Sequence, residues 1–353
     1  MIFLKCDYGE GAHPRIWDAL MKTNMEQCVG YGEDQHCAHA AELIKKRIGR
    51  PDADIHFLVG GTQTNFTTIC SVLRPHEAVI AADRGHICMH ETGAVEARGH
   101  KVIHLPSTDS KIRAEQIDEC IEFHADEHFV KPRLVYITQP TELGAMYTKA
   151  ELLAIRAKCD KYGLYLYIDG ARLAVGLTCE ACDMTIEDIA NIADAFYIGG
   201  TKIGMLFGEA VVLLNEDFKK DFRFMMKQNG GLFAKGWLLG TQFEEMFKDD
   251  LYFELGKHAN DVAKVLRDGL GELGVQFASN SPTNQLFVII PNDKIPEMDK
   301  YFIYEDEGKY DDAHRLVRFC TSWATPMEDA KKALEIMKEI LSLKITSRQI
   351  LRY

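Results

Sequence analysis

One stretch decides the fold of this chain: Leu164-Tyr165-Leu166-Tyr167-Ile168-Asp169-Gly170-Ala171-Arg172. Five apolar or aromatic residues in succession predict a strand that is buried in a sheet, and the acid follows where this strand ends. A second such run, Phe196-Tyr197-Ile198, leads into Gly199-Gly200-Thr201-Lys202. Parallel α/β sheets bind their ligands beyond the carboxyl ends of the strands. The two stretches therefore predict one ligand site that contains Asp169 and Lys202.

The pair of Asp169 and Lys202 has the chemistry to hold pyridoxal phosphate. A carboxylate can keep a proton on a pyridine nitrogen, which makes the ring an electron sink, and a desolvated lysine can form an imine with an aldehyde. Each residue also has an ordinary alternative: Lys202 as a solvated surface lysine, and Asp169 as a helix N-cap. Arg172 is either the ion-pair partner of Asp169 or a second cation near the ring.

Two further segments offer a phosphate cradle and a ring partner. Gly60-Gly61-Thr62-Gln63-Thr64-Asn65 follows a predicted strand and opens a helix, so that free N–H groups and the helix dipole favour a phosphate. A plain glycine turn would explain the same segment. His86 follows another strand and can stack on the ring, although a capping or core histidine would look the same. His90 lies four residues on, but no third ligand is identifiable, so no metal site is predicted.

The chain alternates between strand-like and helix-like segments from about residue 54 to 214. Strands are predicted at 55–59, 78–81, 101–105, 133–138, 164–169, 195–198 and 209–214, and helices at 66–73, 89–98, 112–124, 149–162 and 186–192. This order is typical of an α/β fold with a mostly parallel, seven-stranded sheet covered by helices.

Beyond residue 249 the pattern changes to that of a small α+β domain with an antiparallel sheet. Helices are predicted at 253–273 and 327–343, and strands at 276–277, 285–290 and 316–320. We therefore expect an N-terminal segment and large domain over residues 1–248, and a small C-terminal domain over residues 249–353.

Composition restricts the classes of partner and compartment. The 353 residues are 46% hydrophobic and 27% charged, which fits a soluble globular protein. A net charge of -12 argues against nucleic acid or an anionic membrane as the main partner, and no apolar run is long enough to span a bilayer. The first residues lack the pattern of a secretory signal, so a cytoplasmic location is expected. The ten cysteines are scattered and are expected to be structural, including Cys179 and Cys182.

Together these motifs resemble the threonine aldolase and β-eliminating lyase family of fold-type I pyridoxal phosphate enzymes, over most of the chain. The resemblance implies the fold of aspartate aminotransferase and a set of cofactor-binding residues. Gly61, Thr62 and Asn65 match the phosphate loop, and His86 matches the stacking histidine. Asp169 and Arg172 match the Asp-Gly-Ala-Arg motif that serves the pyridine ring, and Lys202 matches the Schiff-base lysine.

The resemblance also implies residues at the substrate. Arg318 matches the arginine that clamps the substrate carboxylate, together with Arg172, and a guanidinium suits that bidentate role. Cys6 and Asp7 resemble the opening Ser-Asp of the family, with cysteine in place of serine. His128 falls where the family has a further histidine near the substrate hydroxyl.

Two implied residues would act across a subunit boundary. Tyr31, in Tyr31-Gly32-Glu33-Asp34, resembles the family's Tyr-Gly-Asp-Asp segment and is expected near the substrate. Lys235 stands where the family often has arginine, and it would reach a phosphate of the neighbouring subunit. Family members form homodimers or homotetramers with shared active sites, so the same is expected here.

The reaction implied is retro-aldol cleavage of L-threonine, L-allo-threonine or a related β-hydroxy-α-amino acid to glycine and an aldehyde. This would make the chain a carbon–carbon lyase. Lys202 is the expected catalytic attachment point, and His86, His128 or a water is the base. Other pyridoxal phosphate chemistry stays open, namely β-elimination, transamination or racemisation. A more distant alternative is a non-catalytic α/β binding protein. The Ile203-Gly204-Met205 segment departs from the family's Gly-Leu-Gly, which leaves the preferred substrate side chain open.

Overall fold

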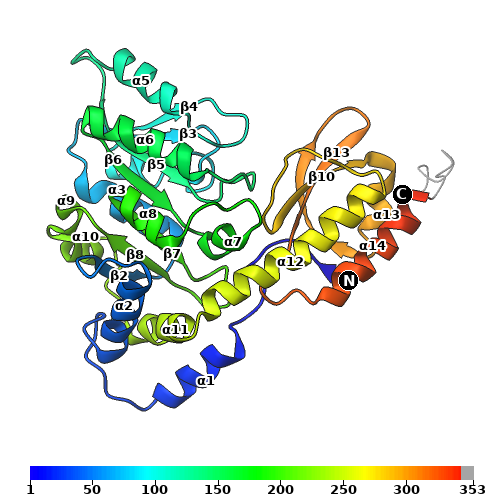
Figure 1. Cartoon of the computed structure of the whole chain (residues 1–353), viewed down its shortest axis with the longest axis horizontal. Helices are drawn as coiled ribbons and strands as arrows, with labels where there is room; N and C mark the ends of the chain where they lie inside the picture. Colours follow the sequence, from blue (N-terminus) through cyan, green and yellow to red (C-terminus); the bar gives the residue numbers. More distant parts are fainter. Residues whose placement is uncertain (343–353) are drawn as a thin grey trace.

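A seven-stranded sheet lies at the centre of the larger part of the molecule (Figure 1). The structure is a computed structural model and describes residues 1–342. Across the sheet the strands run in the order β2 (Asp54–Leu58), β8 (Glu209–Leu213), β7 (Ala195–Gly199), β6 (Tyr165–Asp169), β5 (Lys131–Thr138), β3 (Glu77–Ala82) and β4 (Val102–Leu105). All seven strands predicted between residues 54 and 214 are therefore confirmed.

Six of the strands point the same way, and β8 runs antiparallel to both of its neighbours. The reason is the length of the connection before it. Only residues 200–208 separate β7 from β8, and a parallel crossover needs a dozen residues or more. This short connection turns back just beyond the carboxyl end of β7. Because it carries Lys202, the lysine stays close to that strand end.

Helices cover both faces of this sheet. The helices of this larger part are α1 (Pro14–Thr23), which packs on α11, α2 (Gln35–Arg47), α3 (Gly61–Val72), α4 (His86–Met89), α5 (Ala114–Phe123), α6 (Lys149–Tyr162), α7 (Leu173–Thr178), α8 (Ile186–Ile192), α9 (Glu216–Lys219), α10 (Phe222–Gln228), α11 (Trp237–Lys248) and the 3₁₀ turn η1 (Glu96–Arg98). Strand β6 shows the two faces: Leu166 and Ile168 pack in one apolar cluster, and Tyr165 and Tyr167 pack in the other. This alternation is what a strand between two helical layers requires.

Local signals explain where the predicted helices begin and end. Helix α6 starts at a capping box of Thr148 and Glu151 and stops at Gly163, whose φ of 63° is the left-handed conformation that favours glycine. The helix predicted over 89–98 is wrong. Two short helices, α4 and η1, flank a turn there, with Thr92 and Gly93 both at positive φ, and such residues interrupt a helix.

The smaller part of the molecule is built on a four-stranded antiparallel sheet. Its elements are β9 (Gln276–Phe277), β10 (Gln285–Pro291), η2 (Asn292–Lys294), α13 (Ile295–Met298), β11 (Phe302–Ile303), β12 (Glu305–Lys309), β13 (His314–Cys320) and α14 (Met327–Ser342). The long helix α12 (Leu251–Glu272) runs from the larger part to the smaller part (Figure 1) and packs on α7 and α11 at one end and on α14 at the other.

The first residues of the chain join this smaller part. Strand β1 (Ile2–Phe3) pairs in parallel with β11, and Ile2 and Leu4 are buried in the apolar cluster of the small sheet. The division of the chain at residues 248 and 249 stays a prediction, and residues 343–353 of the expected C-terminal domain lie outside the described residues. Within residues 1–342, no helix combines the length and the apolar composition that a membrane span needs.

Candidate active site

The carboxyl ends of β6 and β7 meet through glycine backbones. The N–H of Gly199 donates to the carbonyl of Gly170 at 3.0 Å. A Cβ atom on Gly170 would lie 1.9 Å from the carbonyl oxygen of Tyr197, and one on Gly199 would lie 2.4 Å from that of Ala171. Only glycine permits this approach. It places Asp169 and Lys202 on the wall of one cavity of about 360 Å³.

Asp169 is buried and held by three donors. Its Oδ2 accepts from the hydroxyl of Tyr136 at 2.6 Å and from Nδ2 of Asn65 at 2.9 Å, and its Oδ1 accepts from the N–H of Ala171 at 2.9 Å. The helix that follows Asp169, α7, has Arg172 and not Asp169 at its N-cap position, so the ordinary alternative of an N-cap does not apply. A fixed carboxylate at the cavity wall suits a cationic ring nitrogen.

Lys202 lies in the same cavity with a lowered pKa. Burial is the main cause and the Arg172 guanidinium adds to it, while the carboxylates of Asp7 and Asp169 act in the opposite direction. A lysine whose pKa falls is a better nucleophile at neutral pH. The alternative of a solvated surface lysine is therefore wrong.

Glu209 is a buried neighbour of Lys202 that the sequence did not single out. Its Oε2 accepts from the N–H of Gly200 at 3.0 Å, and its Oε1 accepts from the hydroxyl of Thr201 at 2.8 Å. Burial raises the pKa of its carboxyl to about 8. Both bonds go to the two residues before Lys202, so Glu209 fixes the segment that carries the lysine.

The N-terminus of α3 forms another side of this cavity. Gly60, Gly61 and Thr62 line the cavity, and no side chain caps the helix. The first N–H groups of a helix need acceptors, and a phosphate provides them. Asn65 lies deeper than predicted: its side chain is fully buried and binds Asp169 and Glu91.

His86 lines the cavity and is held by a buried acid. Its Nδ1 donates to Oε1 of Glu91 at 2.7 Å, and the same oxygen accepts from Nδ2 of Asn65 at 2.7 Å. Asn65 in turn binds Asp169, so one chain of hydrogen bonds links the ring of His86 to the carboxylate at the end of β6. This network orients both groups before any ligand binds.

Arg172 pairs with Asp7 and not with Asp169, so the first of its two alternatives is wrong and the second stays a prediction. Nε and Nη2 of Arg172 donate to the two oxygens of Asp7 at 2.6 and 3.1 Å, and Nδ2 of Asn284 donates to Asp7 at 3.0 Å. Burial opposes ionisation of Asp7, but Arg172 and Lys202 outweigh it and lower the pKa of that carboxyl. Asp7 thus holds Arg172 at the cavity, and it does not line the cavity itself.

A second cavity of about 790 Å³ adjoins the first and opens between the two parts of the molecule. The two cavities share Tyr8, His86, Glu142, Arg172 and Lys202. Arg318 of β13 lines the outer one; its Nη1 lies 3.5 Å from Oε1 of Glu307, and its Nε is buried without a partner. An arginine with unused donors beside Lys202 can receive a carboxylate.

The residues on these walls fit pyridoxal phosphate. The cavity offers a lysine with a lowered pKa, a fixed carboxylate, an imidazole and a helix N-terminus without a capping side chain. These are the groups that the aldehyde, the ring nitrogen, the ring face and the phosphate of this cofactor require.

Comparison with known proteins identifies the family. A model of the β-eliminating lyases matches residues 6–293, which is most of the chain. The chain belongs to the β-eliminating lyase family. It is 33% identical over 288 residues to a low specificity L-threonine aldolase from a Pseudomonas species, covering 80% of this chain and 82% of the relative. It is 28% identical over 333 residues to one from Pseudomonas aeruginosa, covering 92% of this chain and 94% of the relative.

Solved structures of the β-eliminating lyases and of more distant proteins share the fold. A structure of Leishmania major threonine aldolase is 47% identical, with a TM-score of 0.96 over 97% of this chain and 100% of that one. Aspartate aminotransferase from Thermus thermophilus is 15% identical, with a TM-score of 0.71 over 96% of this chain and 91% of that one. The fold is therefore that of the fold-type I pyridoxal phosphate enzymes, as predicted.

His128 does not lie at this β-eliminating lyase site. It precedes β5, at the edge of the sheet opposite to the cavity, because the site lies where the strands end. Its side chain is 83% exposed and contacts Asp126 at 2.5 Å. Within a single chain His128 therefore does not line the cavities around Lys202, and its assignment to the substrate hydroxyl stays a prediction.

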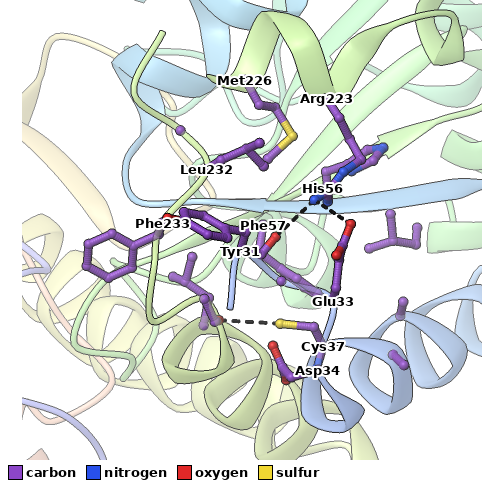
Figure 2. A pocket seen from close by; sticks show the side chains of 17 residues that line it. Tyr31, Glu33, Asp34, Cys37, His56, Phe57, Arg223, Met226, Leu232 and Phe233 are labelled. Atoms are coloured by element: carbon purple, nitrogen blue, oxygen red, sulfur yellow. Dashed lines mark hydrogen bonds and ion pairs between the residues drawn. The ribbon is translucent and has the colours of Figure 1, made fainter. Parts of the chain in front are cut away.

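Tyr31 lines a different pocket of about 220 Å³ (Figure 2), and Lys235 lies in the chain between two residues of its lining, Phe233 and Gly236. The N–H of Tyr31 donates to the carbonyl of Ala234 at 3.3 Å, which joins the two segments. Tyr31 lines this pocket with Arg223 and Phe233 (Figure 2), and Lys235 is exposed beside it. Within a single chain, neither residue lines the cavities around Lys202. Cys6 is partly buried next to Asp7 and is also absent from both linings.

The site contains acids that sequence reasoning missed, namely Glu91, Glu142 and Glu209. Glu142 lines both cavities and follows the end of β5 by four residues. That position at a strand end is the same signal that identified Asp169, and it could have identified Glu142 too. Glu91 and Glu209 had no comparable signal, because each meets its partners only in the folded chain.

Proposed function

We propose that this β-eliminating lyase is a pyridoxal phosphate-dependent aldolase. It cleaves L-threonine, L-allo-threonine or related β-hydroxy-α-amino acids into glycine and an aldehyde. The observation that carries the proposal is the arrangement of the two cavities: Lys202 and Arg172 line both of them, Asp169 lines the inner one, and Arg318 lines the outer one. The names of the relatives, low specificity L-threonine aldolase and threonine aldolase, support the same reaction.

The cofactor would occupy the inner cavity. Lys202 would hold its aldehyde carbon, Asp169 would keep the ring nitrogen protonated, and His86 would lie against the ring. Gly61, Thr62 and the N-terminus of α3 would receive the phosphate. A relative of the same fold, SPT, has been solved with PLP. Bound pyridoxal phosphate supplies a conjugated ring that accepts the electron pair of the bond that breaks.

The substrate would occupy the outer cavity. The unused donors of Arg318 would bind its carboxylate, and Arg172, fixed by Asp7, would keep a second positive charge close by. Holding the carboxylate fixes the rotation about the bond between the amine and Cα. That rotation decides which bond at Cα breaks, and the aldolase requires it to be the bond to Cβ.

The alternative with a specific observation behind it is β-elimination, because the matched family carries that description. Transamination and racemisation use the same groups and start, like β-elimination, with loss of the Cα proton. The products separate the reactions. An aldolase gives glycine and an aldehyde, β-elimination gives a keto acid and ammonia, and racemisation leaves the amino acid intact.

The test is a panel of amino acids incubated with the purified holoenzyme, followed by chiral analysis of the amino acid consumed and assays for aldehyde, keto acid and ammonia. We expect glycine and acetaldehyde in equal amounts from threonine or allo-threonine. Ammonia and a keto acid without aldehyde would contradict the proposal and favour β-elimination.

A homodimer or homotetramer with shared sites belongs to the same proposal. Tyr31 and Lys235 lie away from the cavities of their own chain, so they would serve the site of a partner subunit, near the substrate and the phosphate respectively. A cytoplasmic location stays a prediction from the sequence. Sedimentation of the holoenzyme would report assembly, and equilibrium dialysis would report cofactor affinity. Both, repeated with Lys235→Ala, would show whether the two change together.

A further inference from the structure

Glu142 is a carboxylate at the junction of the two cavities that the proposed function has not used. The chain leaves β5 at Thr138 and brings Glu142 back to the strand end, where it lines the inner cavity with Asp169 and the outer cavity with Arg318. A group at this junction lies between the place for the cofactor and the place for the substrate side chain.

The protein holds the carboxylate of Glu142 with two donors. Its Oε1 accepts from the N–H of His86 at 2.8 Å and from the hydroxyl of Thr138 at 3.1 Å, and its Oε2 accepts from the same hydroxyl at 3.0 Å. These contacts leave acceptor capacity on Oε2, because a carboxylate oxygen has two lone pairs. The group is therefore fixed in place with room for one more hydrogen bond.

Glu142 also differs from the other glutamates of the outer cavity. Glu307 pairs with Arg318, and Glu305 pairs with Lys5 at 3.5 Å. Among the ion pairs within residues 1–342, none involves Glu142. A carboxylate without a cationic partner can gain and lose a proton at neutral pH more readily than a paired one.

The surroundings of Glu142 favour proton exchange near neutrality. Burial is the main reason that the pKa of this carboxyl rises to about 7, and the negative charge of Asp169 adds to it, while the Thr138 hydroxyl and His86 act in the opposite direction. Glu142 interacts electrostatically with Asp169, His86, Cys88, Tyr136 and Tyr147. Tyr8, Arg172 and Lys202 line the same two cavities as Glu142. A general acid or base works best when its pKa lies near the working pH.

We propose that Glu142 is the acid–base group for the β-hydroxyl of the substrate, an inference that rests on the proposed aldolase function. The β-hydroxyl O–H bond breaks, and its proton passes to Oε2 of Glu142. The electron pair of that bond forms the carbonyl of the leaving aldehyde. The Cα–Cβ bond breaks, and the cofactor that Lys202 and Asp169 would hold would supply the acceptor for its electron pair. Cα later takes a proton to give glycine, and Glu142 returns its own proton to solvent.

The competing candidates for this role are less well placed. His128 lies at the other edge of the sheet. His86 has its Nδ1 bound to Glu91, and its ring face is assigned to the cofactor. The carboxylate of Glu142 has no role in binding the cofactor. Its hydrogen bond from the backbone N–H of His86 fixes the two residues relative to each other.

The substitution Glu142→Gln tests this assignment. It keeps the shape of the side chain and an oxygen to accept from His86 and Thr138, but it cannot take the proton. We expect aldehyde release from threonine to fall by about 10²–10⁴-fold. Exchange of the glycine α-proton with deuterium, followed by NMR, should stay within about threefold, because glycine has no β-hydroxyl. The glycine dissociation constant from calorimetry should change as little.

A readout independent of turnover comes from infrared difference spectra recorded between pH 6 and pH 8. Wild-type protein should show a carboxylic acid band with a component that titrates near pH 7, and Glu142→Gln should lose that component and keep the one that Glu209 contributes, because burial raises the pKa of Glu209 too. Glu42→Gln is the control, since it removes an exposed carboxylate that pairs with Lys45 and lines neither cavity, and it should keep both the band and the aldolase rate. Glu142→Asp should restore part of the rate.

The outcomes separate the two levels of the proposal. Equal losses of aldehyde release and glycine exchange in Glu142→Gln would mean that Glu142 only positions His86, and would overturn the assignment, as would an unchanged aldolase rate. Wild-type enzyme that exchanges glycine protons but releases no aldehyde from any β-hydroxy amino acid would overturn the proposed function itself.

Discussion

The two walls of the active cavity hold their charged groups in different ways. On the large sheet, both oxygens of Asp169 are used by three donors at 2.6 to 2.9 Å. On the small sheet, Arg318 has one contact at 3.5 Å and a buried Nε without a partner. A group whose hydrogen bonds are already made within the protein is fixed in place before a ligand binds. A group with unused donors makes its remaining hydrogen bonds to the ligand. The wall for the cofactor is therefore preorganised, and the wall for the substrate is not.

Substitution of Lys202 is the strongest test of the preorganised wall. Lys202→Ala removes the nucleophile, so aldehyde release from threonine should fall by at least about 10³-fold. Lys202→Arg keeps the charge but is a poor nucleophile, and it should not restore the rate. The assay is aldehyde formation by proteins whose circular dichroism matches wild type. A variant that keeps a tenth of the activity would remove Lys202 from the mechanism.

Substitution of Asp7 tests whether the preorganised wall also stabilises the fold. Asp7→Ala leaves the buried guanidinium of Arg172 unpaired, and the free energy of unfolding should fall by about 3 kcal/mol. The measurement is urea denaturation at pH 7. As a control, Asp261→Ala breaks an exposed pair with Lys257 and should change this free energy by less than about 1 kcal/mol.

The same pair predicts a pH dependence of stability. The pKa of Asp7 in the folded protein is lowered from 3.8, so the folded state favours the ionised carboxyl. The stabilisation is complete above pH 3.8 and is lost as the pH falls further, through the folded-state pKa. Wild type and Asp7→Ala should therefore converge in stability only in strongly acidic solution. A difference that stays constant down to pH 2 would contradict this account.

Substitution of Arg318 tests the substrate wall, which is not preorganised. Arg318→Lys keeps the charge but loses the bidentate geometry, and KM for threonine should rise by about 10–100-fold. Affinity for the cofactor, measured by equilibrium dialysis, should stay within about twofold, because Arg318 lines only the outer cavity. If cofactor affinity fell as much as substrate affinity, the division between the two walls would not hold.

The smallest effect is expected for His128, which lies on neither wall. His128→Ala should change kcat/KM by less than about twofold, since the side chain is exposed at the far edge of the sheet. The measurement is a comparison of steady-state kinetics with His86→Ala, which should lose most of the activity. A large loss in His128→Ala would support the original assignment.

Local patterns in the sequence predicted the elements well. The apolar runs gave all seven strands of the large sheet, and the capping box at Thr148 with Gly163 gives the bounds of α6 a local cause. The antiparallel direction of β8 was missed. It depends on the connection from β7, which is too short for a parallel crossover. The helix over 89–98 was wrong, because apolar spacing did not reveal the turn at Thr92 and Gly93.

Site residues could be predicted from the residues alone only where a reactive or charged side chain comes shortly after a predicted strand. Asp169 and Lys202 were found in this way, and Arg318 came from the family resemblance. The pair of Asp7 and Arg172 joins residues 165 positions apart, and nothing local marks such a pair. His128 was placed by chain position alone, and the loop before β5 lies at the opposite edge. Glu142 was overlooked although it follows the end of β5 by four residues, so the same signal could have identified it.

Strand β1 has a consequence for how the protein is handled. Ile2 and Phe3 pair with residues 300 positions away, and the carbonyl of Leu4 accepts from the N–H of Cys320, two residues from Arg318. The amino-terminal strand therefore cannot dock until nearly the whole chain has been synthesised. A fusion that displaced β1 would expose Ile2 and Leu4 and remove the hydrogen bond to Cys320 near Arg318, whereas the large sheet does not include β1.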